Sequence, residues 1–197
     1  MDFVQIIKIV IAFLTPIPFI IGYIYLELIS KRTGTFLNAQ QLLESNLCTL
    51  AEIYKSELVI ELGFIFTSIG LIVTGIFLRD EISYENLGNM IFGISSLASL
   101  CSLLAAMSVR NHTQKLHKYS SRILILFLIV LSILTNIALI LDDRFFGILG
   151  TTITVLPSIY IIYTVRRNKF INKTSQIVFH MSFSFWLWIV MIRLLLQ

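Results

Sequence analysis

Long apolar runs alternate with short polar breaks along the whole chain. Six runs are each long enough to cross about 30 Å of hydrocarbon as a helix that rises about 1.5 Å per residue. They cover residues 4–26, 58–78, 87–107, 123–141, 145–165 and 177–196. The pattern predicts an all-α integral membrane bundle of six transmembrane helices, with residues 1–197 forming a single transmembrane domain.

The spacing inside two runs predicts more than their length does. Pro16 and Pro18 interrupt the first run, and because proline removes a backbone donor we expect this span to be bent or broken. In the third run, small residues recur every three or four positions and form one stripe on a helix. Such stripes allow helices to pack closely in lipid, which predicts a place at the centre of the bundle; a polar translocation path is the alternative. The stripe consists of Ser95, Ser99, Ser102 and Ala106.

The connections between runs differ greatly in length. Residues 142–144 alone separate the fourth and fifth runs, so these spans should be antiparallel neighbours. Residues 31–57 form the longest connection, and their apolar spacing predicts either an amphipathic interfacial helix or a loop folded onto the bundle. In the last run, Arg193 is expected to extend to the membrane surface.

Composition supports the membrane class. The chain is 57% hydrophobic and 13% charged, whereas soluble domains carry about 25% charged residues. The net charge of +4 does not indicate a nucleic-acid partner, because the basic residues lie at the ends of apolar runs. With Asp2 and no basic segment or cleavage site, the N-terminus is interpreted as a retained span rather than a signal peptide. Nothing predicts a disulfide between Cys48 and Cys101.

The distribution of loop charges predicts an orientation. The loops after the first, third and fifth runs hold eleven of the 15 Lys and Arg residues, and most acidic residues lie on the other side. The positive-inside rule therefore puts the basic loops in the cytosol and both termini outside it. Two glycosylation acceptor tripeptides, at Asn111 and Asn172, lie on the predicted cytosolic side and would favour the opposite orientation.

Five ionisable residues should gather at the end where the second, fourth and sixth spans begin. Glu57 and Glu61 share one helix face, and an ionisable group inside a span indicates a functional site. Three histidines accompany them, His112 and His117 in a loop and His180 in the last span. Such a group could bind a metal or move a proton, but it could equally be a structural or lipid-contacting cluster. The chain lacks HExxH, GxSxG, CxxC and phosphate-loop motifs, so we predict no catalytic residue, metal or cofactor.

Three stretches occur in a suggestive order. The long first loop ends in LAEIYKSELVIELGFIFTSIG; an Asn precedes the small-residue span and a basic-flanked His follows it (ENLGNMIFGISSLASL, then NHTQKLHKYSSR); and a His precedes an aromatic last span (IVFHMSFSFWLWIVMI). This order resembles the DRAM-type and Frag/Sfk-type six-span membrane proteins, which are also similar to the N-terminal part of the Cwh proteins. The resemblance implies a non-catalytic role in lipid organisation, GPI-lipid maturation or organelle and autophagy regulation. It marks Asn86, His117, His180 and Trp186, and implies that the loop with His117 is lumenal or external.

The sequence therefore predicts a multi-pass membrane protein that binds membrane lipids, or another membrane protein, without chemistry of its own. In this hypothesis Glu61, His117 and His180 line a cleft at headgroup level, and the basic loops attract anionic headgroups. One alternative is a lipid-modifying enzyme that uses the same cluster with a metal. Another is a small transporter, which requires a continuous polar path past Ser99, Asn136 and Pro157.

Overall fold

The computed structural model describes residues 14–32, 57–110, 113–168 and 173–195, together with Phe3, Ile6, Ile7 and Val10. Within these ranges all of the regular structure is helical, which confirms the predicted all-α membrane bundle. Helices α5 to α9 are each long and apolar enough to cross a bilayer. The helices are α2 (Ile17–Arg32), α5 (Glu57–Glu81), α6 (Glu85–Arg110), α7 (Gln114–Asp142), α8 (Arg144–Asn168) and α9 (Lys173–Leu195).

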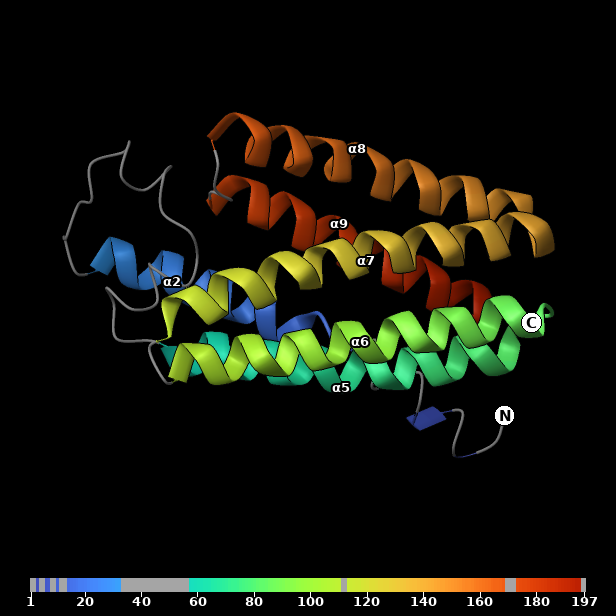
Figure 1. The fold of residues 1–197 in the computed structure, drawn as a ribbon, viewed down its shortest axis with the longest axis horizontal. Coiled ribbons are helices and arrows are strands. Elements are labelled where there is room, and N and C mark those ends of the chain that lie inside the picture. Colours follow the sequence, from blue (N-terminus) through green and yellow to red (C-terminus); the bar gives the residue numbers. More distant parts are fainter. Residues whose placement is uncertain are drawn as a thin grey trace.

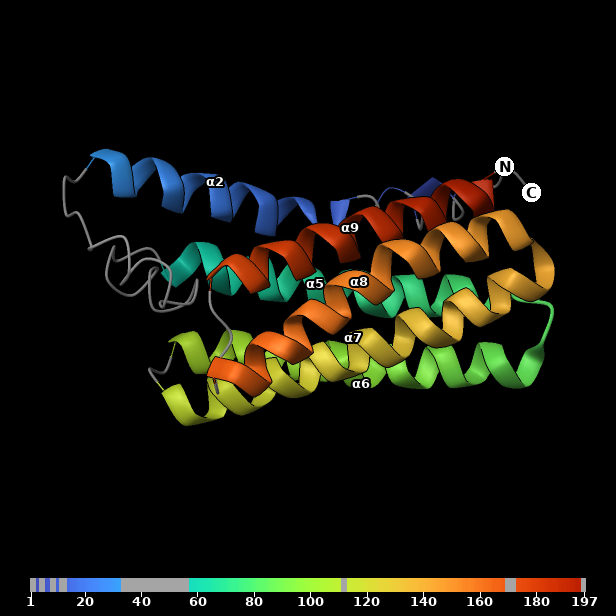
Figure 2. The same cartoon turned by 90° about the horizontal axis from the view of Figure 1, so that it is seen from above.

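Successive helices are antiparallel neighbours. Each of α5 to α8 packs against the helix that follows it, and α2 packs against α5 (Figure 1, Figure 2). Helices α5, α7 and α9 therefore begin at one end of the bundle, where α6 and α8 end. We call this the basic end, for Lys115, Lys118, Arg122, Arg166 and Arg167. The other is the acidic end, for Asp80, Glu81, Glu85, Asp142 and Asp143.

The first predicted span is broken at its prolines, as expected. Thr15 and Pro16 form a turn, and α2 then continues to Arg32, past the predicted end at residue 26. Pro18 lies in the first turn of α2, where a missing N–H costs no helical hydrogen bond. The buried Thr15 packs directly on Gly70 of α5, since a Cβ on Gly70 would lie 2.5 Å from the Thr15 Cβ.

The small-residue stripe of α6 packs against α5, as predicted. All four of its residues are buried, and its three serines hydrogen bond across the interface. Gly75 of α5 allows this approach, because a Cβ there would lie 2.7 Å from the Ser95 Cβ. The serine bonds are Ser95 Oγ to the Leu71 carbonyl, Ser99 Oγ with Ser68 Oγ at 2.7 Å, and Ser102 Oγ to the Phe64 carbonyl at 2.7 Å.

The prediction that this span lies at the centre of the bundle is wrong. The face of α6 opposite the stripe is open, with Met90 55%, Leu100 54% and Met107 58% exposed. Because α6 has helix neighbours only on the sides of α5 and α7 among the described helices, its remaining face is left to contact lipid.

The polar segment between the third and fourth spans is mostly helical rather than a loop. Helix α6 extends to Arg110 and α7 begins at Gln114, not at residue 123. Residues 114–122 contain no proline or glycine, so nothing in the sequence stops a helix that emerges from the hydrocarbon. His117 is therefore on a helix, whereas His112, both acceptor asparagines, Cys48 and residues 33–56 of the long first connection lie outside the described residues.

The short turn between α7 and α8 is confirmed, with Asp143 as its single residue. The prediction for Arg193 is wrong: its side chain does not extend to the surface but is 9% exposed. Its Nε lies 3.9 Å from Asp143 Oδ2, so the acidic turn provides an ionic partner inside the bundle.

Candidate functional site

The residues predicted to contact lipid or a partner are Glu61, Asn86, His117, His180 and Trp186. Three of these five lie in the half of the bundle at the basic end. Glu61 of α5, His117 of α7 and His180 of α9 are each partly buried, within the first two or three turns of their helices. Asn86 is exposed in the first turn of α6, at the acidic end. Trp186 is fully buried farther along α9. The five residues therefore do not form one site.

His117 links three helices. Its Nδ1 lies 3.2 Å from the Ala105 carbonyl oxygen and 3.2 Å from Ser108 Oγ, both on α6. Because a carbonyl only accepts, Nδ1 must carry a proton. The imidazole also meets the ring of Phe64 on α5 edge to face, with centroids 5.7 Å apart. Since Phe64 follows Glu61 by about one helical turn, His117 lies beside the first half of α5, and the cleft with Glu61 and His180 stays a prediction.

Asn136 joins α7, α8 and α9 inside the bundle. Its Oδ1 accepts a hydrogen bond from Trp186 Nε1 at 2.8 Å, and its Nδ2 donates to Thr154 Oγ1 at 3.1 Å. Gly150 makes room for the amide, because a Cβ there would lie 2.5 Å from Asn136 Oδ1. Each of these polar groups has a partner, so the cluster holds the three helices together.

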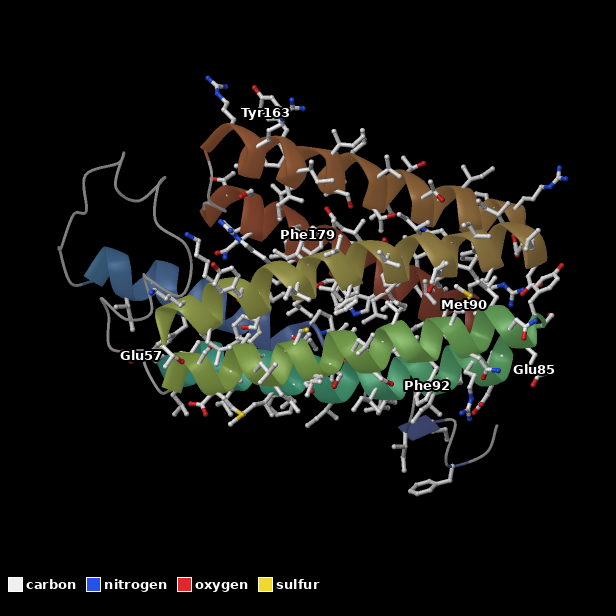
Figure 3. All side chains as sticks on the ribbon, in the orientation of Figure 1. Glu57, Glu85, Met90, Phe92, Tyr163 and Phe179 are labelled. Carbon is white, nitrogen blue, oxygen red and sulfur yellow. The ribbon has the colours of Figure 1, made fainter. Side chains whose placement is uncertain are left out.

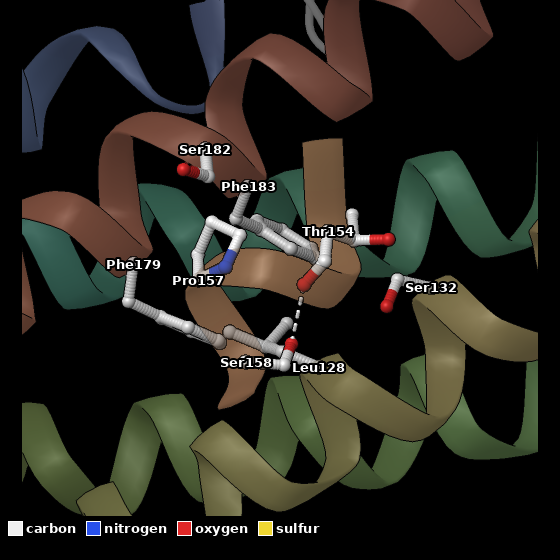
Figure 4. Close-up of a pocket in the computed structure, with 8 residues that line it drawn as sticks. All are labelled: Leu128, Ser132, Thr154, Pro157, Ser158, Phe179, Ser182 and Phe183. Atoms are coloured by element: carbon white, nitrogen blue, oxygen red, sulfur yellow. Dashed lines mark hydrogen bonds between the residues drawn. The ribbon is translucent and has the colours of Figure 1, made fainter. Parts of the chain in front are cut away.

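A pocket lies next to this cluster, where Pro157 interrupts the hydrogen bonding of α8. Its interior volume is about 10 Å³, which is about the least that holds one water molecule. Half of its lining residues carry hydroxyl groups and half are apolar (Figure 4). The lining residues are Leu128, Ser132, Thr154, Pro157, Ser158, Phe179, Ser182 and Phe183.

At the basic end, exposed cations near the helix terminus are followed along the same helix face by exposed apolar residues. On α7, Lys115 and Lys118 are exposed, Arg122 is partly exposed, and Leu126 is 58% exposed, at steps of three and four residues. These four residues therefore form one stripe along the helix, which we call the α7 stripe.

Helix α8 ends in the same way. Arg166 and Arg167 are exposed, and Arg167 Nη1 donates a hydrogen bond to the hydroxyl of Tyr163 at 3.2 Å. Tyr163 projects outward from the bundle in Figure 3 and is 56% exposed. A tyrosine joined to an arginine at the end of an apolar span is typical of the membrane interface.

The ion pair at the acidic end joins a buried arginine to a partly exposed carboxylate and is incomplete. Arg193 Nε and Nη1 have no hydrogen-bond partner among the described residues, although Asp143 lies within ionic range. Asp143 Oδ1 meanwhile accepts a hydrogen bond from the Phe145 N–H at 3.1 Å and so caps α8. One carboxylate thus both starts α8 and neutralises a charge on α9.

The two alternative functions find little geometric support within the described ranges. Ser99 bonds Ser68 between α5 and α6, whereas Asn136 and Pro157 lie between α7, α8 and α9, so these residues do not line one path. In the same ranges no three His, Cys, Asp or Glu side chains converge as a metal site would require.

Two features were not predicted from the sequence. The sequence signal for the pocket is a proline with hydroxyl-bearing residues close to it: Thr154 lies three residues before Pro157, and Ser158 directly follows it. The pairing of Arg193 with Asp143 had a weaker signal, because the two residues are fifty positions apart and on different helices.

The chain was also compared with known proteins. No family model, no characterised protein and no solved structure matches it. The resemblance to the DRAM-type and Frag/Sfk-type proteins therefore remains a prediction from sequence. What the structure establishes is an integral, multi-pass membrane protein with an all-α fold.

Proposed function

We propose that this protein binds anionic membrane lipids at its basic end and has no catalytic activity of its own. The observation that carries the proposal is the α7 stripe, where exposed cations continue into exposed hydrocarbon on one helix face. An anionic lipid has complementary groups in the same order along the membrane normal, with a charged headgroup followed by an acyl chain. Juxtamembrane Lys and Arg residues each contribute about 1 kcal/mol to binding anionic lipid.

The inner side of α7 supports the same proposal. His117 holds the first turns of α7 against α6 and, through Phe64, against α5, so the cations project from a fixed helix rather than from a loop. A fixed array of cations loses little conformational entropy when it binds a headgroup. A protein partner would also be attracted to this charge, but the apolar continuation of the stripe favours a lipid.

We further propose that the basic end faces the cytosol. The supporting argument is the positive-inside rule, applied to the loops after the first, third and fifth predicted spans. The resemblance noted above and the two acceptor asparagines argue for the opposite orientation, which would place the same cations against the other leaflet.

Lipid binding can be measured by native mass spectrometry of the delipidated protein in detergent. We expect phosphatidylglycerol to bind more tightly than phosphatidylcholine, and the double variant Lys115→Gln/Lys118→Gln to bind phosphatidylglycerol roughly 30-fold more weakly. The matched control is Arg79→Gln/Arg144→Gln, which removes two exposed cations from the acidic end and should change the affinity little. An equal loss in both variants would show that net charge alone attracts the lipid.

The orientation can be tested with an impermeant thiol reagent on intact cells. Single cysteines placed at Lys115 and at Glu85, in a Cys48→Ser/Cys101→Ser background, lie at opposite ends of the bundle. We expect the cysteine at position 85 to react from outside and the one at position 115 to react only after permeabilisation. The reverse pattern would overturn the proposed orientation and favour the one implied by the resemblance.

A further inference from the structure

The pocket around Pro157 has a buried floor and a partly exposed rim. Its floor comes from α7, α8 and α9, and its rim from α8 and α9 (Figure 4). Beside the rim, Leu156 is 67% and Ile159 59% exposed on the outer face of α8, where lipid would lie. The pocket therefore opens toward the bilayer. The floor residues are Leu128, Ser132, Thr154 and Phe179, and the rim residues are Pro157, Ser158, Ser182 and Phe183.

Three of the pocket's hydroxyl groups already donate hydrogen bonds to carbonyl groups of their own helices. Ser132 Oγ donates to the Ile129 carbonyl at 2.8 Å, Thr154 Oγ1 to the Gly150 carbonyl at 2.9 Å, and Ser158 Oγ to the Thr154 carbonyl at 2.6 Å. A hydroxyl group has one proton and two lone pairs. These three residues can therefore offer only acceptors to anything that enters the pocket, and Thr154 Oγ1 already accepts one hydrogen bond, from Asn136 Nδ2 at 3.1 Å.

Pro157 removes one backbone donor from α8 beside the pocket. It has no N–H, so the carbonyl of Ile153 lacks the donor that an unbroken helix would supply. Within a bilayer such freed carbonyl groups are satisfied by side chains or by ordered water. None of the eight lining residues is charged, so a matching group should be neutral and should donate a hydrogen bond.

We propose that this pocket binds a neutral hydroxyl group in the membrane interior. The group is supplied either by a water molecule or by an apolar alcohol dissolved in the bilayer, such as a sterol or a long-chain alkanol. The inner space suits a single oxygen, and an alkyl tail would leave across the rim, over Pro157 and Phe183. This site lies away from the α7 stripe and does not depend on headgroup binding there.

The probe for the alcohol is a photoreactive diazirine derivative of octanol, applied to the full chain reconstituted in phosphatidylcholine vesicles. We expect saturable labelling of α8 and α9 peptides that contain Pro157 and Phe183, with competition by unlabelled octanol. Replacing Ser132 by alanine removes one acceptor and should weaken that competition about fivefold. If water is the occupant, octanol will not label these peptides saturably, but radiolytic hydroxyl labelling will still modify Phe183.

Ser96→Ala is the matched control. Ser96 Oγ likewise donates to a carbonyl of its own helix, that of Phe92 at 2.9 Å, but it lies on α6 outside the pocket. Ser158→Ala provides a second pocket variant in case Ser132→Ala fails to fold. The proposal is overturned if neither saturable octanol labelling nor radiolytic labelling occurs at the pocket, or if Ser96→Ala changes the labelling as much as the pocket variants do.

Discussion

Replacing Asp143 by asparagine is expected to lower the free energy of unfolding by about 1–3 kcal/mol. The change removes the carboxylate that faces the buried guanidinium of Arg193, two of whose nitrogens already lack hydrogen-bond partners among the described residues. Asparagine keeps a side-chain oxygen that can cap α8, so the loss should report the ion pair rather than the cap. The measurement is unfolding in mixed detergent micelles as the denaturing detergent is increased, followed by circular dichroism.

The exposed pair Arg79–Asp80 is the matched control. Its N–O distance of 3.0 Å is shorter than the 3.9 Å of the Arg193–Asp143 pair, and its carboxylate is similarly exposed, at 40% against 37%. The two pairs differ in the arginine, which is 41% exposed in Arg79 and 9% in Arg193. Asp80→Asn should therefore cost about 0–1 kcal/mol. The double variant Asp143→Asn/Arg193→Met should regain much of the lost stability, because the stranded charge is gone. If Asp80→Asn costs as much as Asp143→Asn, burial does not set the strength of the acidic-end pair.

Trp186→Ala should be the most destabilising substitution of those considered, at about 3–5 kcal/mol. The indole is completely buried, packs against Phe183 with ring centroids 4.9 Å apart, and donates its N–H to Asn136. The alanine variant loses both the packing and the hydrogen bond. Trp186→Phe keeps most of the packing but leaves the buried Asn136 Oδ1 without its donor, and should lose about 1–3 kcal/mol. The same detergent-unfolding measurement separates the two contributions.

Trp188 provides the internal comparison for this prediction. It is only partly buried and meets Phe185 edge to face at 5.7 Å, on a side of α9 where Phe185 is 54% exposed. Trp188→Ala should therefore cost clearly less than Trp186→Ala. Equal effects would mean that α9 is held by its whole surface rather than by the contact between Trp186 and Asn136.

Some features of the candidate site followed from sequence because they depend only on the order of the spans. The α7 stripe was not among them, because its cations were expected in a loop and share one helix face only since α7 begins at Gln114. Glu61, His117 and His180 lie in the same half of the bundle because alternate spans of an antiparallel bundle begin at the same end. Such statements require only the spans and their order.

Other features could not be predicted because they depend on how helices are rotated about their axes. The sequence marked His117 and Trp186 through a resemblance, but the structure turns His117 toward Phe64 and buries Trp186 against Asn136. The predicted start of α7 was also wrong. Hydropathy detects the hydrocarbon boundary, whereas the helix continues past that boundary as long as no residue stops it.

The sequence by itself determined that this protein resides in a lipid bilayer, that it is helical, and how charge is distributed between its two ends. Lipid requires every backbone polar group to be satisfied internally, so apolar runs of this length had to become helices. Only the tertiary structure decided which side chains of different helices meet: Thr15 with Gly70, Asn136 with Trp186, and Arg193 with Asp143. Lipid is as apolar as the aliphatic and aromatic side chains that cover most helix faces, so hydrophobicity does not determine which face packs inside. Close packing and a few polar contacts determine it.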